Sequence, residues 1–167
     1  MRLSVTQDGK LIAPGLGSFR CALGRTGILM AKKEGDGATP AGIFPLRRVF
    51  FRPDRQPFPV TRLPVWPLHS FDGWCDAPDH PDYNRPVRLP FAASHEKMWR
   101  DDSLYDLGAV LGHNDDPPLP GLGSAIFMHV AKPDYAPTEG CVALSLADLA
   151  ALLGRVEPGD EIEIQAG

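Results

Sequence analysis

Proline is the residue that most constrains how this chain can fold. The sequence has 167 residues, of which 18 are proline and 17 are glycine. Globular proteins contain about 5% proline, so this chain carries roughly twice the usual share. Because proline lacks a backbone N–H and fixes φ, it interrupts helices and the inner strands of sheets. The composition therefore disfavours a helix bundle and favours strands joined by fixed turns and loops.

Length and charge exclude several classes of protein. A chain of 167 residues can bury a core without disulfides or metals, and no composition break divides it, so we expect residues 1–167 to form a single domain. The net charge of −4 argues against a nucleic-acid partner, because phosphate contacts need a basic surface. No run of about 18 apolar residues occurs, so no transmembrane segment is predicted. We expect a monomer.

Alternation of apolar and polar residues predicts a mainly β fold. Leu3 and Val5 start a hairpin that turns at Asp8-Gly9. Further strands are predicted over residues 18–23, 46–51, 104–111, 124–130 and 160–164. Prolines recur throughout residues 53–90, which we interpret as a long ordered loop packed by its aromatic residues.

Two short helices are predicted. One spans Ser94 to Asp102 with Ser94 as its N-cap, and the other begins at Ser145 and ends at Gly154. With so few helices, the strands predict a β-sandwich or barrel with long proline-rich loops.

The pair most suited to catalysis is His129 with Cys141. By two-residue alternation His129 shares a strand face with Phe127 and Ala125, while Met128 faces the other way. Twelve residues later the chain reaches Cys141, which is close enough for a loop to return the thiol to the imidazole. Such a pair predicts a thiolate nucleophile at neutral pH.

The neighbours of Cys141 suit the same chemistry. Gly140 permits close approach of a substrate, and we expect the backbone N–H groups of Gly140, Cys141 and Val142 to form an oxyanion hole. The other cysteines, Cys21 and Cys75, are interpreted as packing residues. Cysteine and histidine spacing fits no zinc site, so we predict no metal.

Two segments resemble motifs of the YkuD-type L,D-transpeptidases of bacterial cell walls. Residues 138–141 (Thr-Glu-Gly-Cys) are similar to the nucleophile motif of that family, and His129 matches its upstream histidine. Residues 37–44 (Gly-Ala-Thr-Pro-Ala-Gly-Ile-Phe) are similar to its Thr-Pro-x-Gly-x-Phe motif. The sequence departs from the family pattern at Val130, Glu139 and Ala143.

The resemblance implies a YkuD-like fold and a cysteine acyltransferase without cofactors. Its expected substrates are peptidoglycan stem peptides, which Cys141 would attack with His129 as general base and acid. The product would be a 3,3 or a 1,3 crosslink. Tyr135, Thr138, Glu139, His113, Asn114 and Arg88 are further candidates for substrate binding.

Two other functions stay open from the sequence. The same site would hydrolyse stem peptides, as an L,D-carboxypeptidase or endopeptidase, if water replaced the amine acceptor. An inactive wall-binding module is the alternative of another class, which the departures at Val130 and Ala143 favour. The family function implies the periplasm, and the cytoplasm is the alternative because the first residues show no signal peptide.

A second proline-rich segment, residues 117–120, precedes the strand of His129. We expect it, together with part of residues 53–90, to wall the cleft that leads to Cys141.

Overall fold

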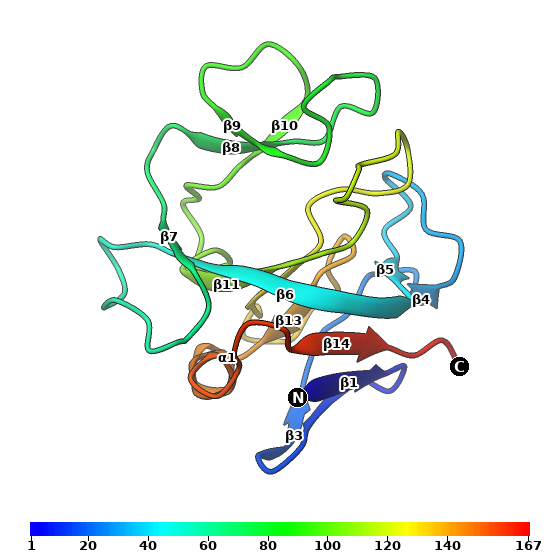
Figure 1. Cartoon of the computed structure of the whole chain (residues 1–167), viewed down its shortest axis with the longest axis vertical. Coiled ribbons are helices and arrows are strands. Elements are labelled where there is room, and N and C mark those ends of the chain that lie inside the picture. Colours follow the sequence, from blue (N-terminus) through cyan, green and yellow to red (C-terminus); the bar gives the residue numbers. More distant parts are fainter.

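The computed structural model describes residues 1–167 and is mainly β, with one helix (Figure 1). Its elements in chain order are β1 (Arg2–Thr6), β2 (Lys10–Ala13), β3 (Gly17–Arg20), β4 (Ile28–Leu29), β5 (Thr39–Pro40), β6 (Gly42–Phe51), β7 (Val65–Pro67), β8 (Asp72–Cys75), β9 (Pro86–Arg88), β10 (His95–Lys97), β11 (Leu107–Leu111), β12 (Phe127–Val130), β13 (Val142–Leu144), α1 (Leu146–Leu153) and β14 (Glu161–Ile164).

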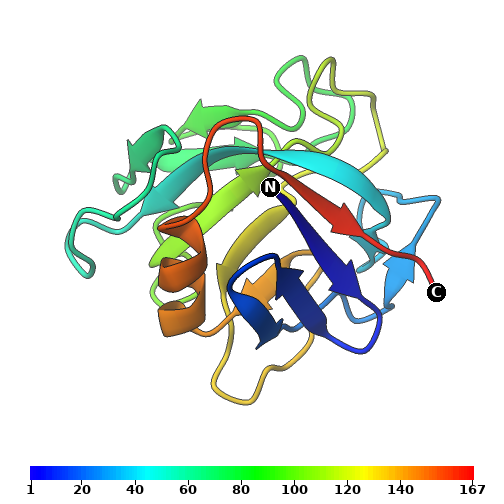
Figure 2. The same ribbon diagram turned by 60° about the horizontal axis from the view of Figure 1, so that its bottom comes forward.

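One nine-stranded sheet dominates the structure. Its order is β13-β12-β11-β6-β14-β1-β2-β3, with β7 added beside β6. After β3 the chain reaches the other edge of this sheet, where Ala22 and Ala143 exchange both backbone hydrogen bonds at 2.8 and 2.9 Å. The sheet therefore almost closes on itself, which confirms the predicted barrel-like β fold. Figure 2 shows β1 and β14, the first and last strands, lying side by side.

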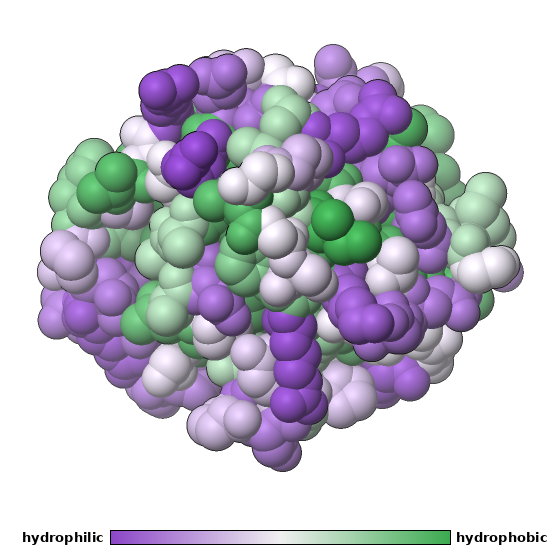
Figure 3. Space-filling model, turned by 90° about the horizontal axis from the view of Figure 1, so that it is seen from below, coloured by the Kyte–Doolittle hydropathy of each residue, from purple (hydrophilic) through white to green (hydrophobic).

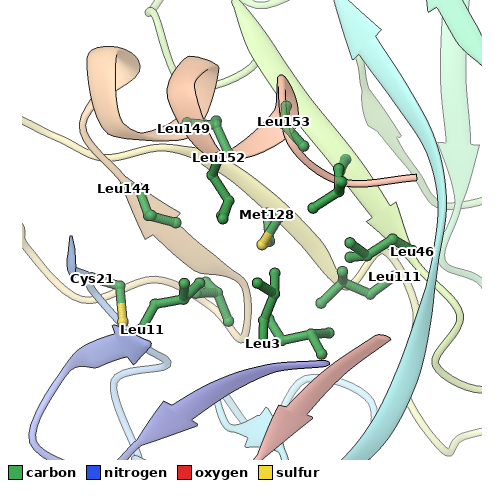
Figure 4. Packing of buried hydrophobic residues seen from close by; sticks show 14 of the residues in the cluster. Leu3, Leu11, Cys21, Leu46, Leu111, Met128, Leu144, Leu149, Leu152 and Leu153 are labelled. Carbon is green, nitrogen blue, oxygen red and sulfur yellow. The ribbon is translucent and has the colours of Figure 1, made fainter. Parts of the chain in front are cut away.

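The inside of this curved sheet holds the main hydrophobic core. Helix α1 closes one side of it, and Figure 4 shows its Leu149, Leu152 and Leu153 directed toward Met128 and Leu144. Ser145 caps the helix as predicted, because its side chain accepts a hydrogen bond from the backbone N–H of Asp148 at 3.1 Å.

A small three-stranded sheet forms a second layer over the outer face of β12, β11 and β6. Its order is β10-β8-β9, and Figure 1 shows it above the long strand β6. Trp74 of β8 meets Phe127 edge to face at 5.0 Å, and Phe127 in turn meets Phe50 at 5.4 Å. This aromatic cluster joins the two layers, and Cys141 belongs to it.

The structure corrects two predictions about local structure. The helix expected over Ser94–Asp102 is wrong, because residues 95–97 form β10 and pair with β8 instead. Sequence-local capping by Ser94 is outweighed there by pairing with a distant strand. Residues 53–90 are packed by aromatic residues as expected, yet they also contain β7, β8 and β9, with Pro67 and Pro86 as strand residues.

The surface carries few large apolar side chains. Met30, Phe58 and Val60 are the most exposed of them, at 78%, 67% and 82%. The face seen in Figure 3 carries apolar residues near its middle with polar residues around them. No helix is long and apolar enough to span a membrane.

The packing of α1 generates a stability prediction. Leu152→Ala removes a side chain that is 0% exposed, so we expect the free energy of unfolding to fall by about 2–5 kcal/mol. Ile12→Ala is the control, because Ile12 is 43% exposed and its loss should change stability by less than about 0.5 kcal/mol. Urea denaturation measures both, and equal losses would contradict the assignment of α1 to the core.

Candidate active site

The parallel pairing of β12 with β13 positions His129 and Cys141. His129 lies opposite Ala143 in this ladder, and Met128 lies opposite Val142. Because side chains alternate, Phe127 and His129 share the outer face with Ala143 and with Cys141, which directly precedes β13. The thiol and the imidazole are therefore diagonal neighbours on one face. Met128 and Val142 point into the main core, so the predicted alternation is confirmed.

The Cys141 side chain is nearly enclosed, with 8% of the residue exposed. Its thiol donates to the carbonyl oxygen of Ala125 at 3.3 Å, and it accepts from the backbone N–H of Phe127 at 3.4 Å. Ala125 holds a positive φ of 53°, which aims its backbone at the thiol instead of continuing the strand. Both partners precede His129 on one segment, so that segment connects the Cys141 thiol to the strand of His129.

The His129 ring is fixed by one hydrogen bond and one aromatic contact. Its Nδ1 lies 2.8 Å from the carbonyl oxygen of Val130, and the ring of Tyr105 meets it edge to face at 5.5 Å. A carbonyl only accepts, so Nδ1 carries the proton in this arrangement. The other ring nitrogen, Nε2, is left with its lone pair and makes no hydrogen bond, which suits a general base.

Burial keeps both groups uncharged at rest. Loss of solvent raises the pKa of the Cys141 thiol to about 12, and the Glu96 carboxyl adds to this rise. Loss of solvent likewise lowers the pKa of His129 to about 4. The resting pair is thus thiol and neutral imidazole, which differs from the thiolate expected from the sequence. The reason is the burial of both groups, whose effect on the two pKa values outweighs that of the nearby charges.

A tight turn presents Cys141. The Thr138 hydroxyl donates to the carbonyl oxygen of Cys141 at 2.7 Å and accepts from the Gly140 N–H at 3.1 Å. The Gly140 N–H is therefore already engaged, and Val142 lies in the ladder with β12. Of the three groups expected to form an oxyanion hole, the Cys141 N–H is the one that neither donates to a side chain nor lies in a strand.

The two segments that resemble family motifs, residues 37–44 and 138–141, are in contact behind this turn. Gly140 has a φ of 140°, and a Cβ there would lie 2.7 Å from the carbonyl oxygen of Ala38. Thr39, the next residue, is 0% exposed and accepts from the backbone N–H of Gly24 at 2.8 Å. The segment 37–44 thus supports the turn before Cys141, and this contact explains why a glycine must precede Cys141.

A cavity of about 220 Å³ opens beside the pair. The expected residues that line it are His129, Thr138, Glu139 and Cys141. The lining residues that sequence reasoning missed as site residues are Glu96, Arg100, Leu104, Tyr105, Lys132, Ala136, Pro137 and Ala143. The lining residues between Glu96 and Tyr105 come from a segment that is distant in sequence from the motifs. No local sequence pattern predicts that this segment lies beside Cys141 and His129.

Four expected substrate-binding residues lie outside this cavity. Tyr135 packs under the guanidinium of Arg20 at 4.2 Å, and Arg88 lies over the Phe71 ring at 4.0 Å. His113 and Asn114 bond to backbone carbonyl groups of residues 119–123 and so brace a loop. The polar atoms of His113 and Asn114 thus serve local structure.

The proline-rich walls also lie elsewhere. Pro117, Pro118 and Pro120 line a separate cavity with Pro78 and Pro81, and no residue of 53–90 lines the cavity of Cys141. The expectation that these prolines wall the cleft is therefore wrong. The wall is formed by residues 96–105 and 132–139 instead.

The protein is mainly β, with a nearly closed sheet. A buried thiol and a buried imidazole line one of its cavities and form a cysteine–histidine site. The chain belongs to the YkuD family, because the profile of the L,D-transpeptidase catalytic domain matches residues 1–164. The resemblance seen in the sequence motifs is thereby confirmed. No curated protein matches the chain significantly.

Similar solved structures are L,D-transpeptidases of mycobacteria. An L,D-transpeptidase from Mycobacterium smegmatis is 15% identical with a TM-score of 0.46, over 99% of this chain and 58% of that one. L,D-transpeptidase 3 from Mycobacterium tuberculosis is 13% identical with a TM-score of 0.49, over 99% of this chain and 60% of that one. The chain thus spans less than two thirds of the length of these relatives. At this identity the likeness concerns the fold alone.

The contact of Gly140 with Ala38 generates a prediction. Gly140→Ala should destabilise the protein by more than the roughly 1–3 kcal/mol typical of a strained φ, because the new Cβ also meets a backbone carbonyl. Gly17→Ala is the matched control, since Gly17 has a φ of 108° and open space around its Cβ position. Thermal unfolding compares them. If Gly140→Ala is no worse than its control, the close approach does not constrain the turn.

The burial of His129 generates a second prediction. Its folded pKa of about 4 lies below the ordinary value of 6.5, so the unfolded chain binds more protons between these pH values. This residue's contribution to stability is complete above pH 6.5 and falls as the pH drops toward 4. Its ring resonance in an NMR titration, assigned with His129→Asn, should shift near pH 4. A midpoint near 6.5 would show a solvated imidazole.

Proposed function

We propose that this chain is a cysteine L,D-transpeptidase that acts on peptidoglycan stem peptides. The observation that carries the proposal is the location of Cys141 and His129 on one cavity, within segments that match the family. Cys141 is the nucleophile and His129 the general base and acid. We further propose that residues 1–167 form one catalytic domain that acts as a monomer, in the periplasm where its substrate lies.

The first step is acylation of Cys141. The thiol turns from the Ala125 carbonyl and gives its proton to Nε2 of His129 as the sulfur attacks the carbonyl carbon of an L residue. The bond from this carbon to the nitrogen of the following D residue breaks. His129 returns the proton to that leaving amine, and a thioester remains. Because thiol and imidazole are both neutral at rest, proton transfer accompanies the attack and does not precede it.

The second step decides between transfer and hydrolysis. An amine of a second stem attacks the thioester carbon, the carbon–sulfur bond breaks, and the surplus proton passes through His129 to the departing sulfur. Water in place of the amine would give an L,D-carboxypeptidase or endopeptidase. The stem position attacked determines whether the crosslink is of the 3,3 or the 1,3 type.

The departures from the family pattern are compatible with activity. Ala143 lines the cavity and leaves room beside the thiol, where the family commonly has a larger polar residue. Val130 is 7% exposed, belongs to the main core and leaves its carbonyl to His129. Neither residue blocks the thiol or the imidazole, which favours an enzyme over an inactive wall-binding module.

The proposal predicts the effects of three cysteine variants. Cys141→Ala should abolish both acylation by a carbapenem and formation of crosslinked muropeptides, because the nucleophile is gone. Its thermal unfolding should stay cooperative. Cys21→Ser and Cys75→Ser are the matched controls, since both cysteines are buried away from the cavity, and turnover per folded molecule should change little.

The same assay, read by mass spectrometry, tests the base and the alternatives. His129→Ala should reduce turnover by roughly 10²-fold. Near-normal turnover in Cys141→Ala would overturn the assignment, and loss of turnover in Cys21→Ser or Cys75→Ser would point to another thiol. Uncrosslinked, shortened stems as the only products would identify a hydrolase, and a lack of acylation in the unmodified protein would favour a binding module.

A further inference from the structure

The cavity beside Cys141 contains a carboxyl group for which the acylation step has no role. Glu96 of β10 lines this cavity together with Cys141 and His129. The Tyr105 hydroxyl donates to Glu96 Oε2 at 2.5 Å, and the same Tyr105 ring packs against His129. Glu96 is thus held in a defined position on the wall of the cavity, and Tyr105 lies between it and the imidazole of His129.

No cation of the protein lies close enough to Glu96 to form an ion pair with it, although Arg100 and Lys132 line the same cavity. The Arg100 guanidinium is committed to Asp102, to which its Nε and Nη2 donate at 2.8 and 2.7 Å. Burial raises the pKa of the Glu96 carboxyl, and the Tyr105 hydroxyl and the nearby charge of Arg100 offset this rise only in part.

The position of Glu96 is unfavourable for the nucleophile alone. Its negative charge contributes to the raised pKa of the Cys141 thiol and so opposes formation of a thiolate. A site that served only acylation would gain from an uncharged residue here. A positively charged ligand removes this conflict, because an ammonium beside Glu96 offsets its charge and gains a charge-assisted hydrogen bond.

We propose that Glu96 is the residue that selects the acceptor, by binding the cationic amine of the second substrate beside the thioester on Cys141. The inference rests on the proposed function and deepens it. The acceptor class is a primary ammonium on a flexible side chain, and Glu96 favours it over water, which carries no charge.

The proton balance of the transfer step follows from this position. The bound ammonium gives one proton to the Glu96 carboxylate and becomes a neutral amine. Its nitrogen attacks the thioester carbon, the carbon–sulfur bond breaks, and the second proton passes through His129 to the Cys141 sulfur. Glu96 then releases its proton to solvent as the product leaves. A carboxyl whose pKa is raised by burial is the better proton acceptor for this role.

The test compares two acceptors on the full chain. The donor is a soluble stem tetrapeptide, and the acceptors are a stem peptide with a cationic side-chain amine and hydroxylamine, which is uncharged at neutral pH. Glu96→Gln should reduce kcat/KM for transfer to the cationic amine by roughly tenfold or more, because the binding of the ammonium and the removal of its proton are both impaired. Transfer to hydroxylamine should not fall. Acylation by a carbapenem should stay the same or become faster, because the amide removes a negative charge that raises the pKa of the Cys141 thiol.

Controls separate this effect from changes in fold or net charge. The amide oxygen introduced by Glu96→Gln still accepts from Tyr105, so the melting temperature should hold. Glu96→Asp should recover part of the preference for the cationic amine. Glu157→Gln changes the same charge at an exposed ion pair with Arg62, outside the cavity, and should leave both acceptors unaffected.

The possible outcomes are distinguishable. If Glu96→Gln slows both acceptors equally, or neither, Glu96 does not select the ammonium and the inference falls while the proposed function stands. If the unmodified protein forms no acyl-enzyme with the carbapenem or the tetrapeptide, the proposed function itself falls and takes the inference with it.

Discussion

The parallel ladder between β12 and β13 is the constraint on which the rest of this structure depends. Met128 and Val142 face the main core and are both 0% exposed, while His129 and Cys141 project on the opposite side. A slip of one residue in this pairing would place the imidazole in the apolar core and Met128 in the cavity. The hydrophobic burial that folds the barrel therefore also sets the positions of the two reactive groups.

The outer face of the same strands determines how these groups react. Aromatic residues and the small sheet bury both groups there, so the thiol and the imidazole are neutral. A neutral pair avoids the cost of burying two charges in an apolar surrounding. It also makes the His129 tautomer important, since the bond from Nδ1 to the Val130 carbonyl is what leaves Nε2 free to accept a proton.

Sequence reasoning succeeded where the physical signal is local. Alternation along residues 125–130 predicted which face His129 occupies, and the cap at Ser145 predicted the helix, because both depend on near neighbours. It failed at residues 94–102, where pairing with the remote strand β8 outweighs a helix-like pattern. Glu96 was missed for the same reason, since its approach to Cys141 depends on how the small sheet is laid over the barrel.

One amide side chain connects that small sheet to the surroundings of the Cys141 thiol. Oδ1 of Asn84, a residue only 5% exposed, accepts at 3.0 Å both from the Trp74 indole of β8 and from the backbone N–H of Ala125. Ala125 is the residue whose carbonyl accepts the Cys141 thiol. Glu96 pairs with Trp74 in the β10–β8 ladder. Strand pairing and hydrogen bonds therefore connect Glu96 to the Cys141 thiol. The proline-rich region therefore affects the site through the position of β8, even though none of its prolines lines the cavity.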